Sequence, residues 1–578
     1  MQKHTVIAFL LMPLFFGAVV VFPSVAKADM IGDSQSFYID SEYDALGRGR
    51  VPATLRLISN RAYVYVDDGA WLTLSPSGRD YYLSFLQGIG DQFDTIVYPR
   101  ETQMFGSEPN PGIDGDQRIT IFINQMKTGV GGYFSDANEL TQDEMGNSNQ
   151  REMLYIGFGV TDSRQFLTFL SHEFNHLLTY NQKTKSLGIV EDTWLNELRA
   201  EYGVTVAGYN NPFWGSSLDR RLQSYLGAPT DSLTNWDEAQ GDYGQVALFG
   251  QYLAEQFSPQ FIAKTAHSRS SGIDSISEEL AANGRAERMA DVFGNWITAN
   301  LLNDASIDSR LGYSGSLQNF HVPAQLVVST VGDASPQITG LTLYPWQGSW
   351  IEYNNISGNK PILDFSFSSE DLNHLRVAYL VWDQSGKVTY HQQAITAADP
   401  HVRINLGMQN PLRIVLMPYR AIPRQGNIDA QPAVSLFVLA QRLEASHITV
   451  PPILEALGLT EGDFIRARGD NDIYVINNFG YKRLILTPGI CLMYGHLQSR
   501  GCFDATKEVS PEVRDAFITS WYATDGENHD GIVYRLDQTG DDAGRLVVVA
   551  STPKLFSQDD FEKKVFLINT SEKNFFLH

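Results

Sequence analysis

The stretch Leu170-Ser171-His172-Glu173-Phe174-Asn175-His176-Leu177-Leu178 lies within a run of apolar residues that recur at helical spacing. Asp162 or Ser163 can cap this helix at its N-terminus. Because His172 and His176 are four residues apart, their imidazoles point to the same side of the helix, one turn apart. Two imidazoles at this spacing can bind one metal ion, so the sequence predicts a metal centre here.

Zinc suits this pair, because it prefers four nitrogen or oxygen ligands at about 2.0–2.2 Å in a tetrahedral arrangement. Three protein ligands would leave one position for water, and Glu173 is placed to accept a proton from that water. The alternative is a structural helix with two half-buried histidines. The metal centre is favoured, since apolar residues on the other faces confine the polar side chains to one stripe.

A second helical segment, residues 194–206, offers the third ligand. It contains Glu197 and Glu201, which are four residues apart and therefore share a face. One carboxylate can bind the metal while the other accepts the outer ring proton of a ligating histidine and fixes its tautomer. A solvated acidic helix face is the alternative interpretation of this pair.

The two segments together resemble the gluzincin metallopeptidases, in which the third ligand is a glutamate on a second helix. The motif is His172-Glu173-x-x-His176, followed by Asn196-Glu197-x-x-Ala200-Glu201. Within this group the chain is most similar to the hyicolysin-like family, over roughly residues 50–310. The further stretches that carry this similarity are Phe105-Gly106-Ser107-Glu108, Pro111-Gly112-Ile113-Asp114, Gly131-Gly132-Tyr133-Phe134 and Asn149-Gln150-Arg151-Glu152-Met153.

The resemblance implies that Glu197 is the third metal ligand and that Glu201 supports a ligating histidine. It also implies a zincin-like α+β catalytic domain. Tyr243 resembles a tyrosine found near the active site in related peptidases, although an ordinary core or surface tyrosine is the favoured interpretation. Leu198 stands where the family pattern has glycine.

These residues predict a zinc-dependent endopeptidase that hydrolyses peptide bonds with a zinc-bound water and Glu173 as general base. The developing oxyanion needs a donor besides zinc, for which Tyr243 is the candidate. Protein or peptide substrate can add as a strand to a sheet edge, and residues 131–135 are the candidate edge. An exopeptidase is one alternative. The other is an inactive surface binding or adhesion protein that uses its C-terminal β domains.

The pattern along the chain predicts a multidomain protein with four parts. Residues 1–28 read as a signal peptide, and residues 29–315 as the metallopeptidase domain, with an N-terminal mixed sheet and a helical C-terminal lobe. Residues 316–445 contain short period-two strands at regular spacing, which predict an antiparallel β-sandwich. Residues 446–578 form a small β-rich unit, in which residues 463–476 and 530–549 look like weak repeats.

The N-terminus predicts export. Its apolar run from Val6 to Phe22 is interrupted by Pro13, and small residues follow at the positions that a signal peptidase reads. An uncleaved membrane anchor is the alternative, although the run is short for a span, and no later stretch is long enough. The mature chain is therefore expected to be secreted, extracellular or at the cell surface. In that setting Cys491 and Cys502 are expected to form a disulfide, with two free thiols as the alternative.

Composition excludes other classes of function. The formal net charge of −23 leaves no basic surface for a phosphate backbone, so nucleic acid is not an expected partner. Calcium is a second cation that the sequence allows, through Asp114 and Asp116 or through Asp470 and Asp472. Neither pair completes the twelve-residue calcium loop, so an ordinary turn is the favoured interpretation. Arg468-Gly469-Asp470 is likewise interpreted as a turn rather than an adhesion tripeptide.

Overall fold

The structure is a computed structural model. It describes residues 28–285, 287–397, 399–406, 410–423, 432–443, 454, 457–494, 500–527, 532–537, 545–550 and 563–576. The predicted signal peptide therefore lies outside the described residues, apart from its last position. The chain divides into two compact units, one made of residues 1–189 and 203–209 and the other of the remaining residues.

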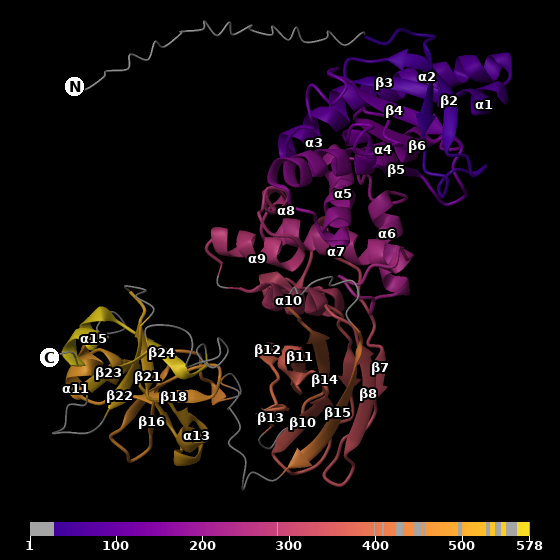
Figure 1. The fold of residues 1–578 in the computed structure, drawn as a ribbon. Coiled ribbons are helices and arrows are strands. Elements are labelled where there is room, and N and C mark those ends of the chain that lie inside the picture. The colour runs from indigo at the N-terminus through magenta and orange to yellow at the C-terminus, as the bar shows by residue number, and fades with distance from the viewer. Residues whose placement is uncertain are drawn as a thin grey trace, which may run out of the picture. The chain divides into compact units, whose positions relative to one another are not determined.

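The first unit is built on a six-stranded mixed sheet with the order β1-β2-β3-β4-β6-β5. Figure 1 labels β2 to β6 of this sheet. The three central neighbours β3, β4 and β6 are parallel, while the strands toward both ends pair antiparallel. β3 and β4 are buried at every residue, as strands covered on both faces must be. The strands are β1 (Ser34–Tyr38), β2 (Arg50–Ile58), β3 (Ala62–Asp67), β4 (Ile119–Asn124), β5 (Gly132–Phe134) and β6 (Met153–Gly157).

Helices of the first unit pack against this sheet. α4 (Ser163–Thr179) contacts β5 and β6, and α2 (Pro76–Gln92) contacts β2. α3 (Tyr98–Phe105) packs on α4, and the short α1 (Asp68–Leu72) follows β3 directly. The β-rich residues 55–67 do not form a single strand: the chain turns back at residues 59–61, between the end of β2 and the start of β3.

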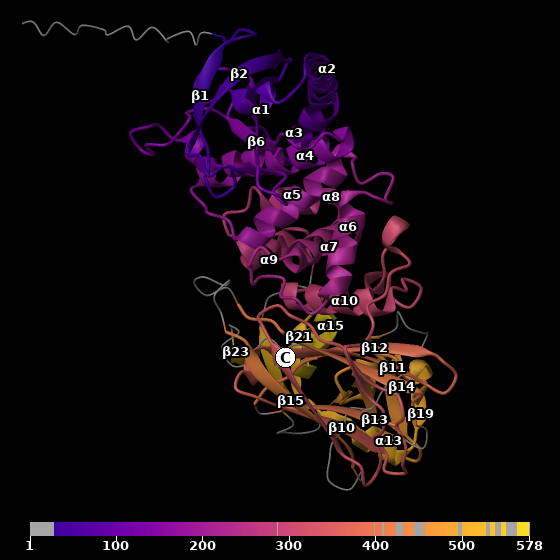
Figure 2. The same cartoon turned by 90° about the vertical axis from the view of Figure 1, so that its right-hand side faces the viewer.

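The helical lobe belongs mainly to the second unit, and its helices succeed one another along the chain (Figure 2). α5 (Thr193–Ala207) contributes to both units, because residues 203–209 belong to the first. The later helices are α6 (Ser217–Gly227), α7 (Gln240–Gln256), α8 (Pro259–Thr265), α9 (Gly272–Ala282) and α10 (Met289–Leu302).

Residues 326–443 form a β-sandwich. One sheet has the order β13-β10-β15-β8 and the other the order β12-β11-β14-β9-β7. Every pairing is antiparallel except that of β7 with β9. The strands are β7 (Leu326–Val328), β8 (Gln337–Leu343), β9 (Ile351–Tyr353), β10 (Ile362–Ser369), β11 (Leu375–Trp382), β12 (Val388–Ala394), β13 (His401–Asn405), β14 (Arg413–Arg420) and β15 (Val434–Leu443).

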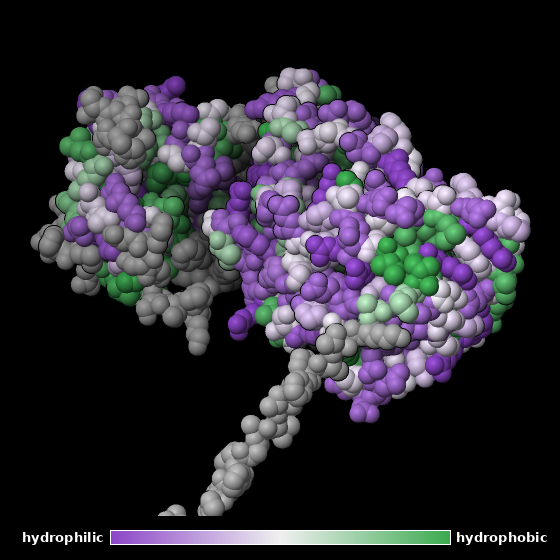
Figure 3. All heavy atoms as spheres, turned by 90° about the horizontal axis from the view of Figure 1, so that it is seen from above, coloured by the Kyte–Doolittle hydropathy of each residue, from purple (hydrophilic) through white to green (hydrophobic). Residues whose placement is uncertain are grey.

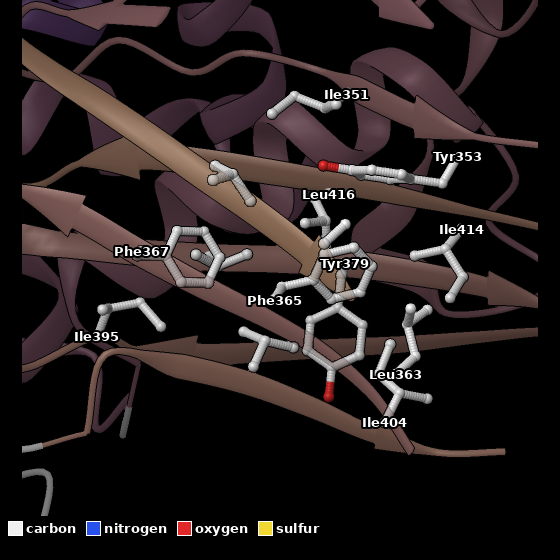
Figure 4. Close-up of a cluster of buried hydrophobic side chains, with 14 of the residues drawn as sticks. Ile351, Tyr353, Leu363, Phe365, Phe367, Tyr379, Ile395, Ile404, Ile414 and Leu416 are labelled. Carbon is white, nitrogen blue, oxygen red and sulfur yellow. The ribbon is translucent and has the colours of Figure 1, made fainter. Parts of the chain in front are cut away.

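The sandwich core is filled from both sheets (Figure 4). Leu363, Phe365 and Phe367 of β10 lie on one side, and Tyr379 of β11 and Leu416 of β14 on the other. The alternation of buried and exposed residues in β15 is the pattern of a strand with one buried face. The β-sandwich that the period-two pattern predicts for this region is therefore present in the structure.

The C-terminal part consists of two small sheets that share one hydrophobic core. In each sheet the first strand pairs antiparallel with the second and parallel with the fourth, and the second pairs antiparallel with the third. The strands in this order are β16 (Phe464–Ala467), β17 (Ile473–Ile476), β18 (Tyr481–Leu484) and β19 (Lys507–Val509), then β21 (Tyr522–Asp525), β22 (Val533–Asp537), β23 (Arg545–Ala550) and β24 (Val565–Ile568), with β20 (Ile518–Thr519) added to the first sheet.

Cys491 of α11 (Pro488–Leu492) and Cys502 of α12 (Cys502–Ala505) form a disulfide in this core, which confirms the predicted pairing. The fold class is also confirmed: the chain is a multidomain α+β protein with an N-terminal mixed sheet and a helical lobe, followed by β-sheet units. Within the described residues, no helix has the length and apolarity needed to cross a bilayer. The face shown in Figure 3 is largely hydrophilic, with small apolar areas, as expected of a strongly charged chain.

Candidate metal centre

α4 carries the histidine pair and is fixed along its whole length. The Asp162 carboxylate caps it by accepting a hydrogen bond from the backbone of Gln165, 2.8 Å away. Phe174, on a face away from the histidines, packs against the rings of Phe93 and Tyr98, with centroids 5.2 and 5.6 Å away. The helix therefore presents its polar stripe from a tightly packed support, as the apolar spacing predicts.

The two imidazoles converge. The Nε2 atoms of His172 and His176 are 3.2 Å apart, and the rings are nearly perpendicular, with an interplanar angle of 80°. Two nitrogens bound to one zinc ion at 2.0–2.1 Å with a tetrahedral angle would be about 3.3 Å apart. The histidine pair is therefore already spaced as two ligands of one ion.

Glu197 of α5 completes a group of three. One ligand atom each from His172, His176 and Glu197 lies within 4.8 Å of the other two. Among the described residues, this is the one group of three or more His, Cys, Asp or Glu side chains with that property. Two imidazoles and a carboxylate are a donor set that zinc accepts, so these residues fit the predicted ion.

Glu173 lies beside the edge strand. Its side chain is mostly buried, and a Cβ atom built on Gly132 of β5 would be 3.1 Å from Glu173 Cγ. β5 stands at the end of the strand order and pairs with β6. The structure thus brings the predicted general base and the predicted substrate edge together.

Glu201 is one turn after Glu197 and contacts Arg221 of α6. Arg221 Nε and Nη2 donate to the same oxygen, Glu201 Oε1, at 2.9 and 2.5 Å. Burial lowers the pKa of Arg221, but the Glu201 carboxylate, together with Tyr243 and Glu197, outweighs burial, and the pKa is raised. Arg221 is therefore a fixed positive charge close to both glutamates of α5.

Tyr243 of α7 belongs to the same neighbourhood. The guanidinium of Arg221 lies 4.5 Å above its ring, and Trp236 packs edge-on against it at 5.0 Å. The predicted tyrosine is thus one contact away from the α5 glutamates, and its half-buried ring is held by a cation and an indole.

Leu198, which replaces the glycine of the family pattern, is fully buried against α7. A Cβ atom on Gly250 of α7 would be 3.2 Å from Leu198 Cγ and Cδ2. Leu198 of α5 therefore packs directly against α7 at a position where α7 has no side chain. The larger residue after Glu197 is accommodated by the smaller residue opposite.

The residues considered for calcium make turn contacts. Asp114 Oδ1 accepts from the backbone of Asp116 at 2.8 Å, and Asp116 accepts from Arg118 and Tyr63. Asp470 accepts from the backbone of Asp472 and pairs with Arg514. Neither pair belongs to the metal group found among the described residues.

Two residues of this neighbourhood have no signal in the sequence. Arg221 is an ordinary helical arginine until the fold places it beside Glu201. Glu101 of α3 is fully buried and accepts hydrogen bonds from Ser171 and Asn175 of α4. Burial raises the pKa of the Glu101 carboxyl to about 8, in spite of these two donors. The contacts of Arg221 and Glu101 join segments that are distant in the chain, and such contacts cannot be predicted from a single sequence.

Among the comparisons with known proteins, only the search of solved structures found similar proteins. No protein-family model matches the chain, and no curated protein matches it. Among solved structures, the chain is similar to the ZmpB metallopeptidase from Clostridium perfringens, with 13% identity, a TM-score of 0.24, and coverage of 63% of this chain and 66% of that one. A metallopeptidase from Bacteroides thetaiotaomicron gives 8% identity, a TM-score of 0.22, and coverage of 61% and 64%.

A shorter match concerns 21% of this chain. It covers 97% of the pre-peptidase C-terminal domain of a collagenase from Bacillus anthracis, with 13% identity and a TM-score of 0.14. The chain thus spans just under two thirds of the length of each of the two metallopeptidases named above. These likenesses are distant, and the chemistry of the site rests on the side chains described above.

Proposed function

We propose that this chain is a secreted zinc-dependent endopeptidase, with His172, His176 and Glu197 as metal ligands and Glu173 as general base. The observation that carries the proposal is the convergence of three ligand atoms within 4.8 Å, two of them imidazole nitrogens 3.2 Å apart. Two imidazole nitrogens and a carboxylate at these distances are a donor set that one zinc ion can accept.

A bound zinc ion would polarise the scissile carbonyl and lower the pKa of a coordinated water to about 7. Glu173 follows His172 directly and lies against β5, so its carboxylate can take the water proton and return it to the leaving amine. Tyr243, whose ring lies against Arg221, and Arg221 itself are our candidates for donating to the oxyanion.

Endopeptidase activity is favoured over exopeptidase activity by β5. A strand at the end of a sheet can pair with an extended peptide at any point of the peptide's length, and it does not require a free terminus. The disulfide between Cys491 and Cys502 supports export to an oxidising compartment, since such bonds are rare in reducing ones. Contact with a cell surface through the C-terminal β domains is part of the same proposal.

The test uses the purified chain without its signal peptide. Casein cleavage should require stoichiometric zinc, stop with a chelator and resume when zinc is restored. Glu173→Gln should keep the metal and lower kcat by about 10²–10⁴-fold, the range for loss of a general base. A wild-type protein that holds zinc and cleaves no peptide would refute the enzyme and favour the binding protein. A Glu173→Gln variant with wild-type kcat would refute the assigned base.

A further inference from the structure

Glu101 connects three helices behind the candidate metal centre. Its side chain has no exposed surface. Ser171 Oγ donates to Glu101 Oε1 at 2.5 Å, and Asn175 Nδ2 donates to Oε2 at 3.2 Å. A carboxylate removed from water is costly unless it is hydrogen-bonded, so these two contacts define where α4 can sit against α3.

The two donors occupy informative positions on α4. Ser171 precedes His172 and Asn175 precedes His176, so each donor is one residue from a candidate ligand. Donors four residues apart lie along one face, and contacts to both therefore fix the rotation of α4 about its axis. Side-chain tips are about 6 Å from a helix axis, so a rotation of about 10° would move the imidazole tips by about 1 Å.

α5 approaches the same carboxylate. A Cβ atom on Gly203 would lie 3.0 Å from Glu101 Oε2 and 3.0 Å from Asn175 Nδ2. At Gly203, where α5 has no side chain, the α5 backbone therefore packs directly against the side chains of Glu101 and Asn175. The same helix carries Glu197 less than two turns earlier, so this contact also bears on the third ligand.

We propose that Glu101 is a positioning residue for the metal centre: it sets the rotation of the histidine helix and the seat of the glutamate helix through Ser171, Asn175 and Gly203. The inference rests on the proposed zinc site and names a residue outside it. Glu101 contacts neither metal nor substrate. Glu101 affects only the positions of the candidate ligands, so the zinc dissociation constant is the quantity that should change when Glu101 is replaced.

The experiment measures the zinc dissociation constant by competition with a chelator, and the visible spectrum of the cobalt-substituted protein. Glu101→Ala, which removes both acceptors, should raise the dissociation constant about 10–100-fold, as loss of an outer partner does in other metal sites. It should also change the tetrahedral cobalt bands. Glu101→Gln keeps one acceptor and should recover much of the affinity. Gly203→Ala should weaken binding by pressing on the same pair.

Asp67→Asn is the matched control. Asp67 is another fully buried carboxylate of the same unit, and it contacts Arg48 and the backbone at the start of α1. This variant should lower the thermal midpoint and leave zinc affinity and the cobalt spectrum unchanged. If Glu101→Ala does not fold, Gly203→Ala carries the test, because it is expected to weaken zinc binding while Glu101 stays in place.

The outcomes separate the two proposals. If Glu101→Ala and Gly203→Ala fold and bind zinc with wild-type affinity, the positioning role is overturned, and the proposed function stands as long as the wild-type protein cleaves peptides. A wild-type protein that binds no zinc would overturn both. If zinc affinity is weakened in Glu101→Ala and Gly203→Ala and unchanged in Asp67→Asn, the positioning role is supported, even if no peptide is cleaved.

Discussion

Glu197 and Glu201 differ in role at the scale of single residues, although they are one turn apart on the same helix. Glu197 belongs to the group of ligand atoms, while Glu201 is held through one oxygen by Arg221. An ion pair with little access to water is geometrically fixed, so Glu201 cannot swing to replace its neighbour.

Replacing Glu197 with alanine should therefore cost more zinc affinity than replacing Glu201. The first change removes one of the three candidate ligands, whereas the second removes the carboxylate that pairs with Arg221 and no candidate ligand atom. Chelator competition on the two variants measures the difference. Equal losses would contradict the assignment of Glu197 as the ligand.

A second buried carboxylate, Glu139, should make stability depend on pH. Its side chain has no exposed surface, and the Lys185 ammonium is 4.0 Å away. Burial, and next the Glu152 charge, raise the pKa of Glu139 to about 9. The folded chain therefore keeps a proton that the unfolded chain releases above about pH 4.5, and the free energy of unfolding should fall between these two values.

Glu139→Gln should flatten this decline, since the amide does not titrate. The slope removed can reach about 1.4 kcal/mol per pH unit, the value for one proton. Urea unfolding of both proteins from pH 5 to pH 9, at constant zinc, measures it. Parallel curves would show that Glu139 does not hold its proton in the folded state.

The candidate site divides into what local spacing determines and what only the fold determines. His172, Glu173 and His176, and the Glu197–Glu201 pair, could be predicted because helical periodicity fixes which side chains share a face. Arg221 and Glu101 could not, since their contacts join segments 20 and about 70 residues apart in the chain. Spacing along one helix carries no information about its neighbours.

At the scale of elements, β5 imposes a strict size limit. A Cβ atom on Gly132 would lie 2.7 Å from the Tyr155 carbonyl oxygen and 3.1 Å from Glu173 Cγ. The first contact is with backbone, so the strand or the glutamate must move if a methyl group is added.

Gly132→Ala should therefore lower kcat by about 100-fold, the cost of misplacing a catalytic group by about 1 Å. Zinc affinity should stay close to wild type, because no ligand touches the new methyl group. Gly159→Ala is the control, as its Cβ would meet no atom within 4 Å. The prediction fails if both variants have the wild-type kcat.

Element prediction from the sequence succeeded where periodicity was strong. The histidine helix and the β-sandwich agree with the structure, whereas β12 is a strand that its own sequence does not predict. Every residue of β12 is half-exposed, and its sequence VTYHQQA shows no apolar alternation. Its strand conformation comes from pairing with β11, a contact that the local sequence does not encode.

At the scale of the whole molecule, the disulfide stabilises a part of the chain remote in sequence from the metal centre. The bond closes a loop of 11 residues, and its loss should cost about 3 kcal/mol. Cys491 and Cys502 pack in the core shared by the two C-terminal sheets, which contains no residue of the candidate site.

The double variant Cys491→Ala, Cys502→Ala should therefore lower the unfolding temperature of the C-terminal part. Zinc affinity and the cleavage of a short peptide should be unchanged. Scanning calorimetry and a peptide assay measure these two effects. Loss of zinc from the variant would show that the C-terminal part supports the metal centre.

If the chain is the endopeptidase proposed above, the short length of β5 limits which substrates it can cleave. Three residues in extended conformation span about 10 Å, so the strand can align only a few residues of a target chain. A target must leave its own secondary structure to make even these pairings. The proposed enzyme should therefore leave compact, well-folded proteins intact and cleave unfolded segments and exposed loops.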